Sequence, residues 1–189
     1  MDATLLLTAD HNRVRGLFTR FRSAKENDDK AGMTTLAATI LEELDIHTRI
    51  EEQIFYPAVK AADSDLGEEV AEGLQEHHVV KTLAAEIEAL APGEEEWAAK
   101  LTVVTEMVEH HAEEEEQEMF PKVRNLFDVD ALAQLGDQME AMKAELGAPT
   151  VQDKEAFTTE RLKQLATAQE IPGRSSMNRE ELLATVAPS

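Results

Sequence analysis

The chain has 189 residues, enough for one domain with a core and a small appendage. Its 39 acidic and 18 basic side chains give a formal net charge of −21, which disfavours binding to nucleic acid or to an anionic membrane. The lack of cysteine excludes disulfides, thiolate metal sites and cysteine nucleophiles. No stretch approaches the roughly 18 apolar residues of a membrane span, and the N-terminal leucine run is too short and acidic for a signal peptide. A cytoplasmic protein is expected.

Good helix formers dominate the sequence, and apolar residues recur at spacings of three and four in four long segments. These segments predict helices over about residues 3–26, 33–62, 68–90 and 94–119. The loops between them are short, which favours antiparallel neighbours and an all-α, up-down-up-down four-helix bundle. A fifth helix over about residues 129–146 is expected to cap this bundle.

The C-terminal part differs from the predicted bundle domain of residues 1–147. Residues 148–156 predict a linker, and residues 157–189 predict a small helix-turn-helix appendage with no net charge. The segment "IPGRSSMNREEL" at 171–182 resembles the SAP-like, Rho N-terminal-type motif, and this resemblance implies binding to nucleic acid or to a protein partner. Because the appendage is neutral, we favour a docking module for a protein partner over nucleic-acid binding.

Each of the four bundle helices carries a histidine on its apolar stripe, namely His11, His47, His77 and His111. Two carboxylates, Glu51 and Glu115, follow a histidine by four residues and share its helix face. One histidine on an apolar face is usually a hydrogen-bonded core residue. Four imidazoles with two carboxylates would make a poor core unless a metal binds them. Because each carboxylate can bridge, the set suits more than one ion.

Two of these histidines have histidine neighbours, so their orientation must be inferred. His77 shares its face with apolar residues, whereas His78 shares a face with Lys81 and Thr82. The same comparison favours His111 over His110 as the inward residue. We therefore expect His78 and His110 to be solvated.

The motif "HTRIEEQIFYP" at 47–57 is nearly repeated as "HAEEEEQEMFP" at 111–121. In both copies the histidine and glutamate lie one helical turn apart, and a proline follows ten residues after the histidine. Proline cannot extend the hydrogen-bond ladder, so Pro57 and Pro121 are expected to kink or end their helices just past the site. Of the glutamates in the second copy, only Glu115 is expected to face inward, and the others to face solvent.

Together with "DH" at 10–11 and "EH" at 76–77, these motifs resemble the hemerythrin-like (HHE cation-binding) family over roughly residues 1–147. The resemblance implies an oxo- or hydroxo-bridged, non-heme di-iron centre with two iron ions in a four-helix bundle. It assigns six metal ligands at matching positions, with Glu51 and Glu115 as the bridging carboxylates: His11, His47, Glu51, His77, His111 and Glu115.

The sequence departs from the oxygen carriers of that family at two places. Those proteins have a further histidine one turn before the third-helix histidine, where this chain has Gly73. They also have an aspartate five residues after the fourth-helix histidine; here Glu116 has that offset from His111 and Glu115 has it from His110, which leaves the register open.

Tyr56, the single tyrosine, is a seventh candidate metal ligand. Some actinobacterial hemerythrin-like proteins, which this sequence resembles in "ELDIHTRIEEQIFYP" and "EEEW", have a tyrosine at this place. In an unbroken helix Tyr56 would point roughly half a turn away from Glu51, so a distortion at Pro57 is needed to turn it inward. The alternative is an amphipathic residue that packs at a helix end.

These observations favour a di-iron protein that reacts with hydrogen peroxide or nitric oxide, in a catalase-like or detoxifying role. The position without a fifth histidine is open to water, substrate or an oxygen ligand, and oxygen ligands stabilise ferric iron. The alternative is reversible O₂ binding, or iron storage or sensing, without turnover.

Overall fold

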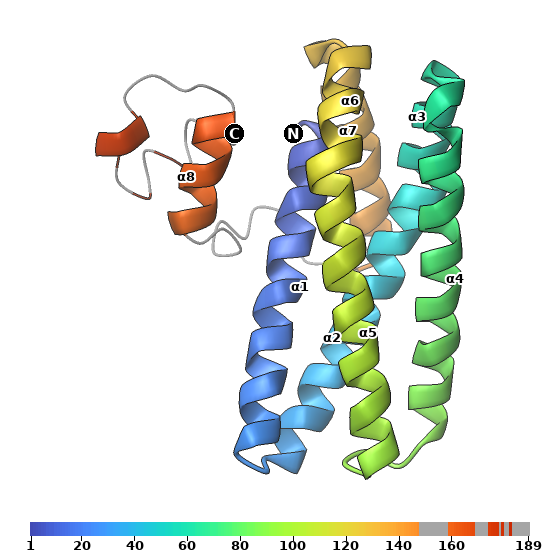
Figure 1. The fold of residues 1–189 in the computed structure, drawn as a ribbon, viewed down its shortest axis with the longest axis vertical. Coiled ribbons are helices and arrows are strands. Elements are labelled where there is room, and N and C mark those ends of the chain that lie inside the picture. The colour runs from blue at the N-terminus through green and yellow to red at the C-terminus, as the bar shows by residue number, and fades with distance from the viewer. Residues whose placement is uncertain (148–158, 169–173, 178, 180–181, 183–189) are drawn as a thin grey trace.

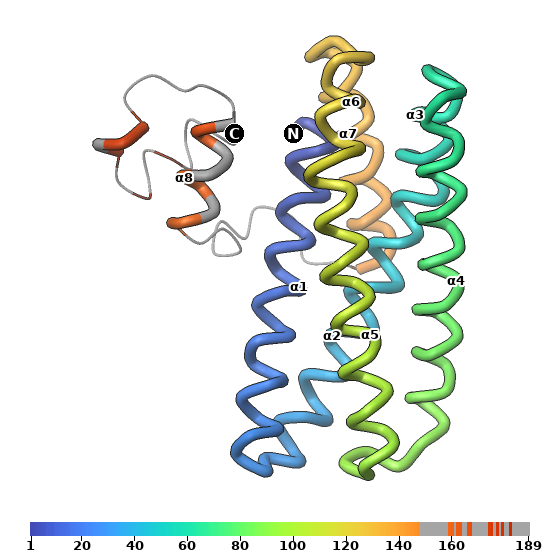
Figure 2. The backbone as a smooth tube through the Cα atoms, viewed as in Figure 1, coloured from blue at the N-terminus to red at the C-terminus, as the bar shows by residue number. Residues whose placement is uncertain are grey.

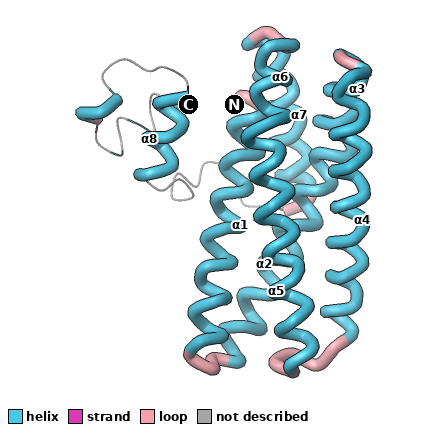
Figure 3. Tube along the Cα trace, in the orientation of Figure 1, coloured by secondary structure: helices cyan, strands magenta, loops and turns pink. Residues whose placement is uncertain are grey.

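The computed structural model describes residues 1–147, 159–168, 174–177, 179 and 182, and within these ranges it contains helices and loops but no strand (Figures 1 and 3). Four antiparallel helical segments form the expected bundle, and a fifth helix, α7, packs beside α1. The all-α prediction is therefore confirmed. The elements of the bundle, in chain order, are α1 (Ala3–Glu26), α2 (Lys30–Ile50), η1 (Glu51–Phe55), α3 (Tyr56–Ala62), η2 (Ser64–Leu66), α4 (Gly67–Ala89), α5 (Glu95–Glu114), η3 (Glu115–Met119), α6 (Phe120–Leu126) and α7 (Val129–Glu145).

Aspartates cap three of these helices. The carboxylate of Asp2 accepts hydrogen bonds from the first backbone amides of α1, and Asp29 and Asp128 do the same for α2 and α7. Each such cap satisfies amide donors that have no partner inside the helix, and it is worth about 1 kcal/mol. The turn between α1 and α2 includes Asp28 with a φ of 53°, a conformation that aspartate tolerates better than most residues. The short capped turn keeps the two helices antiparallel.

The core consists of two apolar clusters with a polar layer between them. One cluster contains Leu6, Phe55 and Phe120, and the other contains Phe18 and Trp97. Along α1 the sequence passes from Leu7 in the first cluster through His11 to Val14 in the second. Burial of each large side chain contributes about 1.5–3 kcal/mol, so the bundle is held closed on both sides of the histidine layer.

Of the two outcomes expected at each proline, a kink or an end of the helix, the structure excludes the end. The helical trace runs past Pro57 to Ala62 and past Pro121 to Leu126, so neither helix ends at its proline (Figure 2). Instead, five residues of π-helix precede α3 and α6, each of which has its proline in the first turn. Proline lacks an N–H and crowds the carbonyl four residues earlier, so it interrupts the ordinary α-helical ladder. The π-helical segments stand directly before this interruption.

The π-helical segments have a clear hydrogen-bond signature. The amide of Tyr56 donates to the carbonyl of Glu51, and the amide of Phe120 donates to that of Glu115. This bonding brings residues five apart onto nearly the same face, whereas an α-helix separates them by about 140°. The two motif copies therefore share a backbone distortion that begins at the inner glutamate, which is Glu51 in the first copy and Glu115 in the second.

Helix α7 approaches α1 closely at its glycine. A Cβ atom at Gly136 would overlap the backbone of Met1, so the close contact depends on the missing side chain. Further along α7, Lys143 is buried and forms an ion pair with Asp10 of α1. This fifth helix thus contributes a charged side chain close to the histidine layer.

The C-terminal region is described only in part. Helix α8 (Thr159–Ala168) and the turn η4 (Arg174–Ser176) are described, whereas the predicted linker at 148–156 and much of the motif at 171–182 lie outside the described residues. Leu162, Ala166 and Leu182 pack with Leu5 and Ala9 of α1. None of the helices described is long and apolar enough to cross a membrane.

Candidate metal centre

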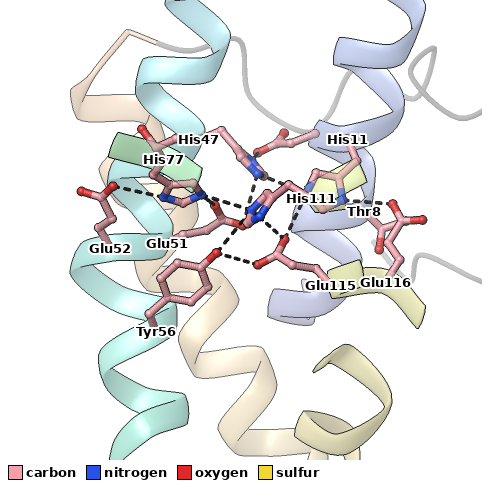
Figure 4. Close-up of polar contacts among 12 residues, drawn as sticks. Thr8, His11, His47, Glu51, Glu52, Tyr56, His77, His111, Glu115 and Glu116 are labelled. Carbon is pink, nitrogen blue, oxygen red and sulfur yellow. Dashed lines mark hydrogen bonds and ion pairs between the residues drawn. The ribbon is translucent and has the colours of Figure 1, made fainter. Parts of the chain in front are cut away.

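The four predicted inward histidines come together in the middle of the bundle (Figure 4). His11 comes from α1, His47 from α2, His77 from α4 and His111 from α5, and all four are buried. Their sequence neighbours His78 and His110 are exposed. Helical periodicity explains this arrangement, because adjacent residues on a helix point about 100° apart.

The first group of side chains contains two imidazoles and two carboxylates. The Nε2 atoms of His11 and His47 lie 3.1 Å apart. Glu51 Oε1 is 3.2 Å from the His47 nitrogen, and Glu115 Oε2 is 3.3 Å from the His11 nitrogen. All four residues offer ligand atoms within 4.8 Å of one another, as a metal ion requires.

The second group shares Glu51 with the first. The Nε2 atoms of His77 and His111 lie 3.2 Å apart, and Glu51 Oε2 lies 3.2 Å from the His77 nitrogen. The two oxygens of Glu51 therefore face different histidine pairs, as a bridging carboxylate would. Glu115 also approaches this group, with Oε2 3.8 Å from Nε2 of His111.

Several buried polar atoms at the centre have no hydrogen-bond partner among the described residues. They include both carboxylate oxygens of Glu51 and Oε2 of Glu115. Glu51 is fully buried, and Glu115 is 3% exposed. An unsatisfied buried carboxylate costs several kcal/mol unless a cation compensates it. Imidazole nitrogens and carboxylate oxygens are both good ligands for iron, so the side chains fit the metal that the family resemblance implies.

Outside this centre, each histidine faces a second carboxylate through Nδ1. His11 contacts Glu116 at 3.0 Å, His77 contacts Glu52 at 3.1 Å and His111 contacts Glu76 at 2.6 Å, each by an N–H···O hydrogen bond. The corresponding His47–Asp10 distance is 3.6 Å, which is an ion-pair distance. A proton held on Nδ1 leaves the Nε2 lone pair free for a metal.

The position of Glu116 differs from the one expected from the sequence. This residue was expected to face solvent, yet its side chain is only 10% exposed and it also accepts a hydrogen bond from Arg15 at 2.8 Å. The π-helical segment, whose second residue is Glu116, brings it beside α1. It is thus part of the site rather than of the solvated face.

Lys143 adds a positive charge behind the His47–Asp10 pair. Its ammonium group donates to Oδ1 of Asp10, and both side chains are buried. Burial raises the pKa of Asp10, but the contacts with His47 and Lys143 outweigh it and hold that pKa below its ordinary value. The carboxylate therefore stays ionised beside His47.

Tyr56 is turned into the centre by the π-helical segment. Its hydroxyl donates a hydrogen bond to Glu115 Oε1 at 2.8 Å and lies 3.4 Å from Nε2 of His111 (Figure 4). On the facing helix α4, a Cβ atom at Gly73 would lie 2.9 Å from that hydroxyl. The tyrosine thus reaches into space that depends on the glycine, which stands where the oxygen carriers have a histidine.

Without a metal, the centre holds protons tightly. Burial lowers the pKa of His47, but Glu51 and Asp10 outweigh it and raise the pKa to about 10. For His111, burial is likewise outweighed by Glu115 and Glu76, and its pKa rises to about 9. Burial raises the pKa of Glu51, yet His47 and His77 hold it well below its usual range. A metal that binds these imidazoles must displace their protons, so binding is expected to release protons to solvent.

The phenol of Tyr56 is also protonated in the metal-free state. Burial first, and then the negative charges of Glu115 and Glu51, raise its pKa well above the ordinary value. The hydroxyl proton therefore stays on the oxygen and is shared with Glu115. A cation placed beside this oxygen would oppose both effects.

Sequence reasoning did not assign the outer carboxylates or Lys143 to the site. A usable signal was present for the carboxylates, because each is the chain neighbour of an inner residue: Asp10 of His11, Glu52 of Glu51, Glu76 of His77, and Glu116 of Glu115. In all four cases the histidine contacted lies on a different helical segment from the carboxylate. For Lys143 the sequence held no such signal.

Comparison with known proteins agrees with this geometry. Residues 2–123 match the family described as Hemerythrin HHE cation binding domain. Uncharacterized proteins of Mycobacterium tuberculosis and Mycobacterium bovis are each 37% identical over 154 residues, which is 79% of this chain and 90% of theirs. A protein of Nostoc sp. named DNA nickase is 26% identical over 147 residues, which is 77% of this chain and 40% of that protein. No solved structure matches the chain significantly. The chain belongs to the hemerythrin HHE cation-binding family, as a metal-binding helical bundle.

Proposed function

We propose that the chain is a non-heme di-iron protein that reacts with small oxidants, either by disproportionating hydrogen peroxide or by consuming nitric oxide. The proposed metal ligands are His11, His47, Glu51, His77, His111 and Glu115, with Tyr56 as an additional ligand of the second group. Two iron ions bound between these side chains would supply inner-sphere redox chemistry toward a small ligand. The chain itself would position the donor atoms and the protons around these ions.

The observation that carries the proposal is the position of the Tyr56 hydroxyl. It lies 3.4 Å from His111 and 2.8 Å from Glu115, next to Gly73 rather than next to a further imidazole. The second group therefore offers an oxygen donor where the oxygen carriers offer nitrogen. Anionic oxygen ligands stabilise the ferric state, whereas reversible O₂ binding needs a resting ferrous state. This difference favours turnover over oxygen carriage.

In the metal-free chain, a proton lies next to the site. The Tyr56 hydroxyl holds it and donates to Glu115 Oε1, and Glu115 in turn spans both groups. The outer carboxylates hold protons on Nδ1 of the histidines, which keeps the imidazoles oriented. This proton belongs to the metal-free chain; binding of Tyr56 to iron as phenolate would release it, as binding of the imidazoles releases theirs.

The test is spectroscopy and turnover of the purified, iron-loaded chain. Addition of hydrogen peroxide should evolve O₂, and nitric oxide should change the visible spectrum and be consumed. The variant Tyr56→Phe should keep its iron and lose peroxide turnover. If that variant keeps wild-type spectrum and turnover, Tyr56 is a packing residue. If the wild-type ferrous protein binds and releases O₂ without oxidation, the alternative of oxygen binding replaces the proposal.

A further inference from the structure

A third pair with the His-x-x-x-Glu spacing lies on the outside of α5. His110 and Glu114 are one helical turn apart, which is also the spacing of His47–Glu51 and His111–Glu115 in the centre. The distance between His110 Nε2 and Glu114 Oε1 is 3.3 Å. Glu76 of α4 completes a group whose ligand atoms all lie within 4.8 Å of one another. An imidazole and two carboxylates are a reasonable donor set for Fe²⁺, Mn²⁺ or Zn²⁺.

This outer group borders a pocket that leads to the centre. The pocket has a volume of about 70 Å³ and is lined by residues of α4, α5 and η3, which include Glu76 and Glu114 of the outer group and His111 and Glu115 of the centre. Glu115 is 3% exposed, and its Oε2 has no hydrogen-bond partner among the described residues. This oxygen faces Nε2 of His11 and of His111, so the pocket wall includes a ligand of the proposed iron centre.

The charge of the pocket also supports the passage of a cation. Its wall carries six carboxylates, which are Glu69, Glu72, Glu76, Glu114, Glu115 and Glu118. Lys122 lies 2.7 Å from Glu69 and compensates one of them. A cleft lined by one sign of charge raises the local concentration of the opposite ion and speeds its capture.

Glu76 links the outer group to the inner one. Its Oε2 accepts a hydrogen bond from Nδ1 of His111 at 2.6 Å, while its side chain is 23% exposed. His110 is exposed and Glu114 is partly exposed, so the two are better suited to a transient cation than to a permanent one, because water competes for the ion. We infer that Glu76, His110 and Glu114 form an outer divalent-cation site, where Fe²⁺ binds before it passes along the pocket to the centre.

The inference rests on the proposed di-iron function, but it is tested by metal uptake and not by turnover. Full-length metal-free protein is mixed with Fe²⁺ under anaerobic conditions, and the rate and final stoichiometry of uptake are measured. His110→Ala and Glu114→Gln should slow uptake on the order of tenfold at low ionic strength while final iron content stays at the wild-type value. Salt should slow uptake by wild type and reduce the difference in uptake rate between wild type and the two variants.

His78→Ala is the matched control, because His78 is also an exposed histidine beside an inward one and belongs to none of the three candidate groups. It should leave uptake unchanged. Uptake by His110→Ala at the wild-type rate would overturn the inference, and so would a loss of final iron content, which would make His110 a ligand of the centre.

A second measurement detects the outer site directly. Iron-loaded protein is titrated with Mn²⁺ and followed by electron paramagnetic resonance. One weakly bound Mn²⁺ per chain is expected, lost in His110→Ala and retained in His78→Ala. If the wild type takes up no iron, the metal-free protein should still bind one Mn²⁺ more than His110→Ala does. Equal Mn²⁺ binding by wild type and His110→Ala refutes the outer site, whatever becomes of the proposed peroxide chemistry.

Discussion

Gly73 and Tyr56 face each other across the bundle so closely that the glycine can carry no side chain without a shift. A Cβ at Gly73 would lie 2.9 Å from the Tyr56 hydroxyl and 3.3 Å from Cε1 of His111. The glycine at the position of the carriers' further histidine and the inward tyrosine are therefore one structural feature. The glycine leaves the space, and the π-helical segment before Pro57 turns the tyrosine into it.

Gly73→Ala should move Tyr56 away from the centre. If the phenolate binds ferric iron, wild type should show a charge-transfer band in the visible region, and the alanine variant should shift or lose it while still binding iron. Gly67→Ala on the same helix is the control, because a Cβ there meets nothing within 4 Å. An identical visible spectrum for Gly73→Ala and wild type would contradict the role of this contact.

Glu51→Ala and Glu115→Ala should lose iron. Wild type is expected to hold about two irons per chain, because Glu51 faces both histidine pairs and two carboxylates can bridge. Metal analysis after gel filtration measures the loss, and circular dichroism shows whether the bundle persists. His78→Ala should retain wild-type iron content. One ion or none in folded wild-type protein would refute the di-iron assignment.

Lys143→Met should destabilise the protein even without metal. The substitution removes the ammonium partner of a buried carboxylate and leaves Asp10 with His47 alone. Loss of one partner of a buried pair costs about 3–5 kcal/mol. Urea unfolding of the metal-free variant measures this. Addition of Asp10→Asn should recover part of the loss. Lys122→Met, which removes an exposed ion pair, should cost much less stability than Lys143→Met. Equal effects of the two lysine variants would argue against the buried pair.

The metal-free protein should lose stability as the solution becomes alkaline. His47 and His111 have folded pKa values of about 10 and about 9, raised from 6.5. A raised folded pKa contributes stability that is complete below about pH 6.5 and is lost as the pH rises through the folded value. Glu51, whose pKa is lowered, contributes stability above its ordinary value of 4.5 that is lost as the pH falls through the folded value.

Urea unfolding between about pH 4 and 10 should therefore show greatest stability between about pH 5 and 7. His47→Gln should flatten the alkaline side of the stability curve, because it removes the group with the higher pKa of the two. Wild-type stability that stays constant from neutral to alkaline pH would show that the imidazoles are not held protonated.

Removal of residues 148–189 should leave the bundle folded and able to bind iron, because every proposed ligand lies before residue 148. The truncation uncovers Leu5 and Ala9, which pack with Leu162, Ala166 and Leu182, so a moderate loss of stability is expected. Circular dichroism and metal analysis of the shortened chain provide the measurement. Loss of helicity or of iron would show that the C-terminal region is part of the bundle core.

Local pattern was enough to predict the helices and the six inner side chains. The spacing of three and four residues that places His11, His47, His77 and His111 on apolar stripes is a property of each helix alone, and so is the one-turn offset of Glu51 and Glu115. The antiparallel order follows from short loops. These features can be predicted because they depend on residues close together in the chain.

The remaining features of the site depend on contacts between helices and could not be predicted from the sequence. The π-helical bonding at Glu51–Phe55, the space left by Gly73 for Tyr56, and the pairing of Lys143 with Asp10 depend on residues far apart in the sequence. The outer carboxylates stand beside inner residues in the sequence, yet which histidine each one contacts is set by how the helices pack. Helical periodicity gives a side chain its direction around one axis, and only the packed bundle determines what it meets there.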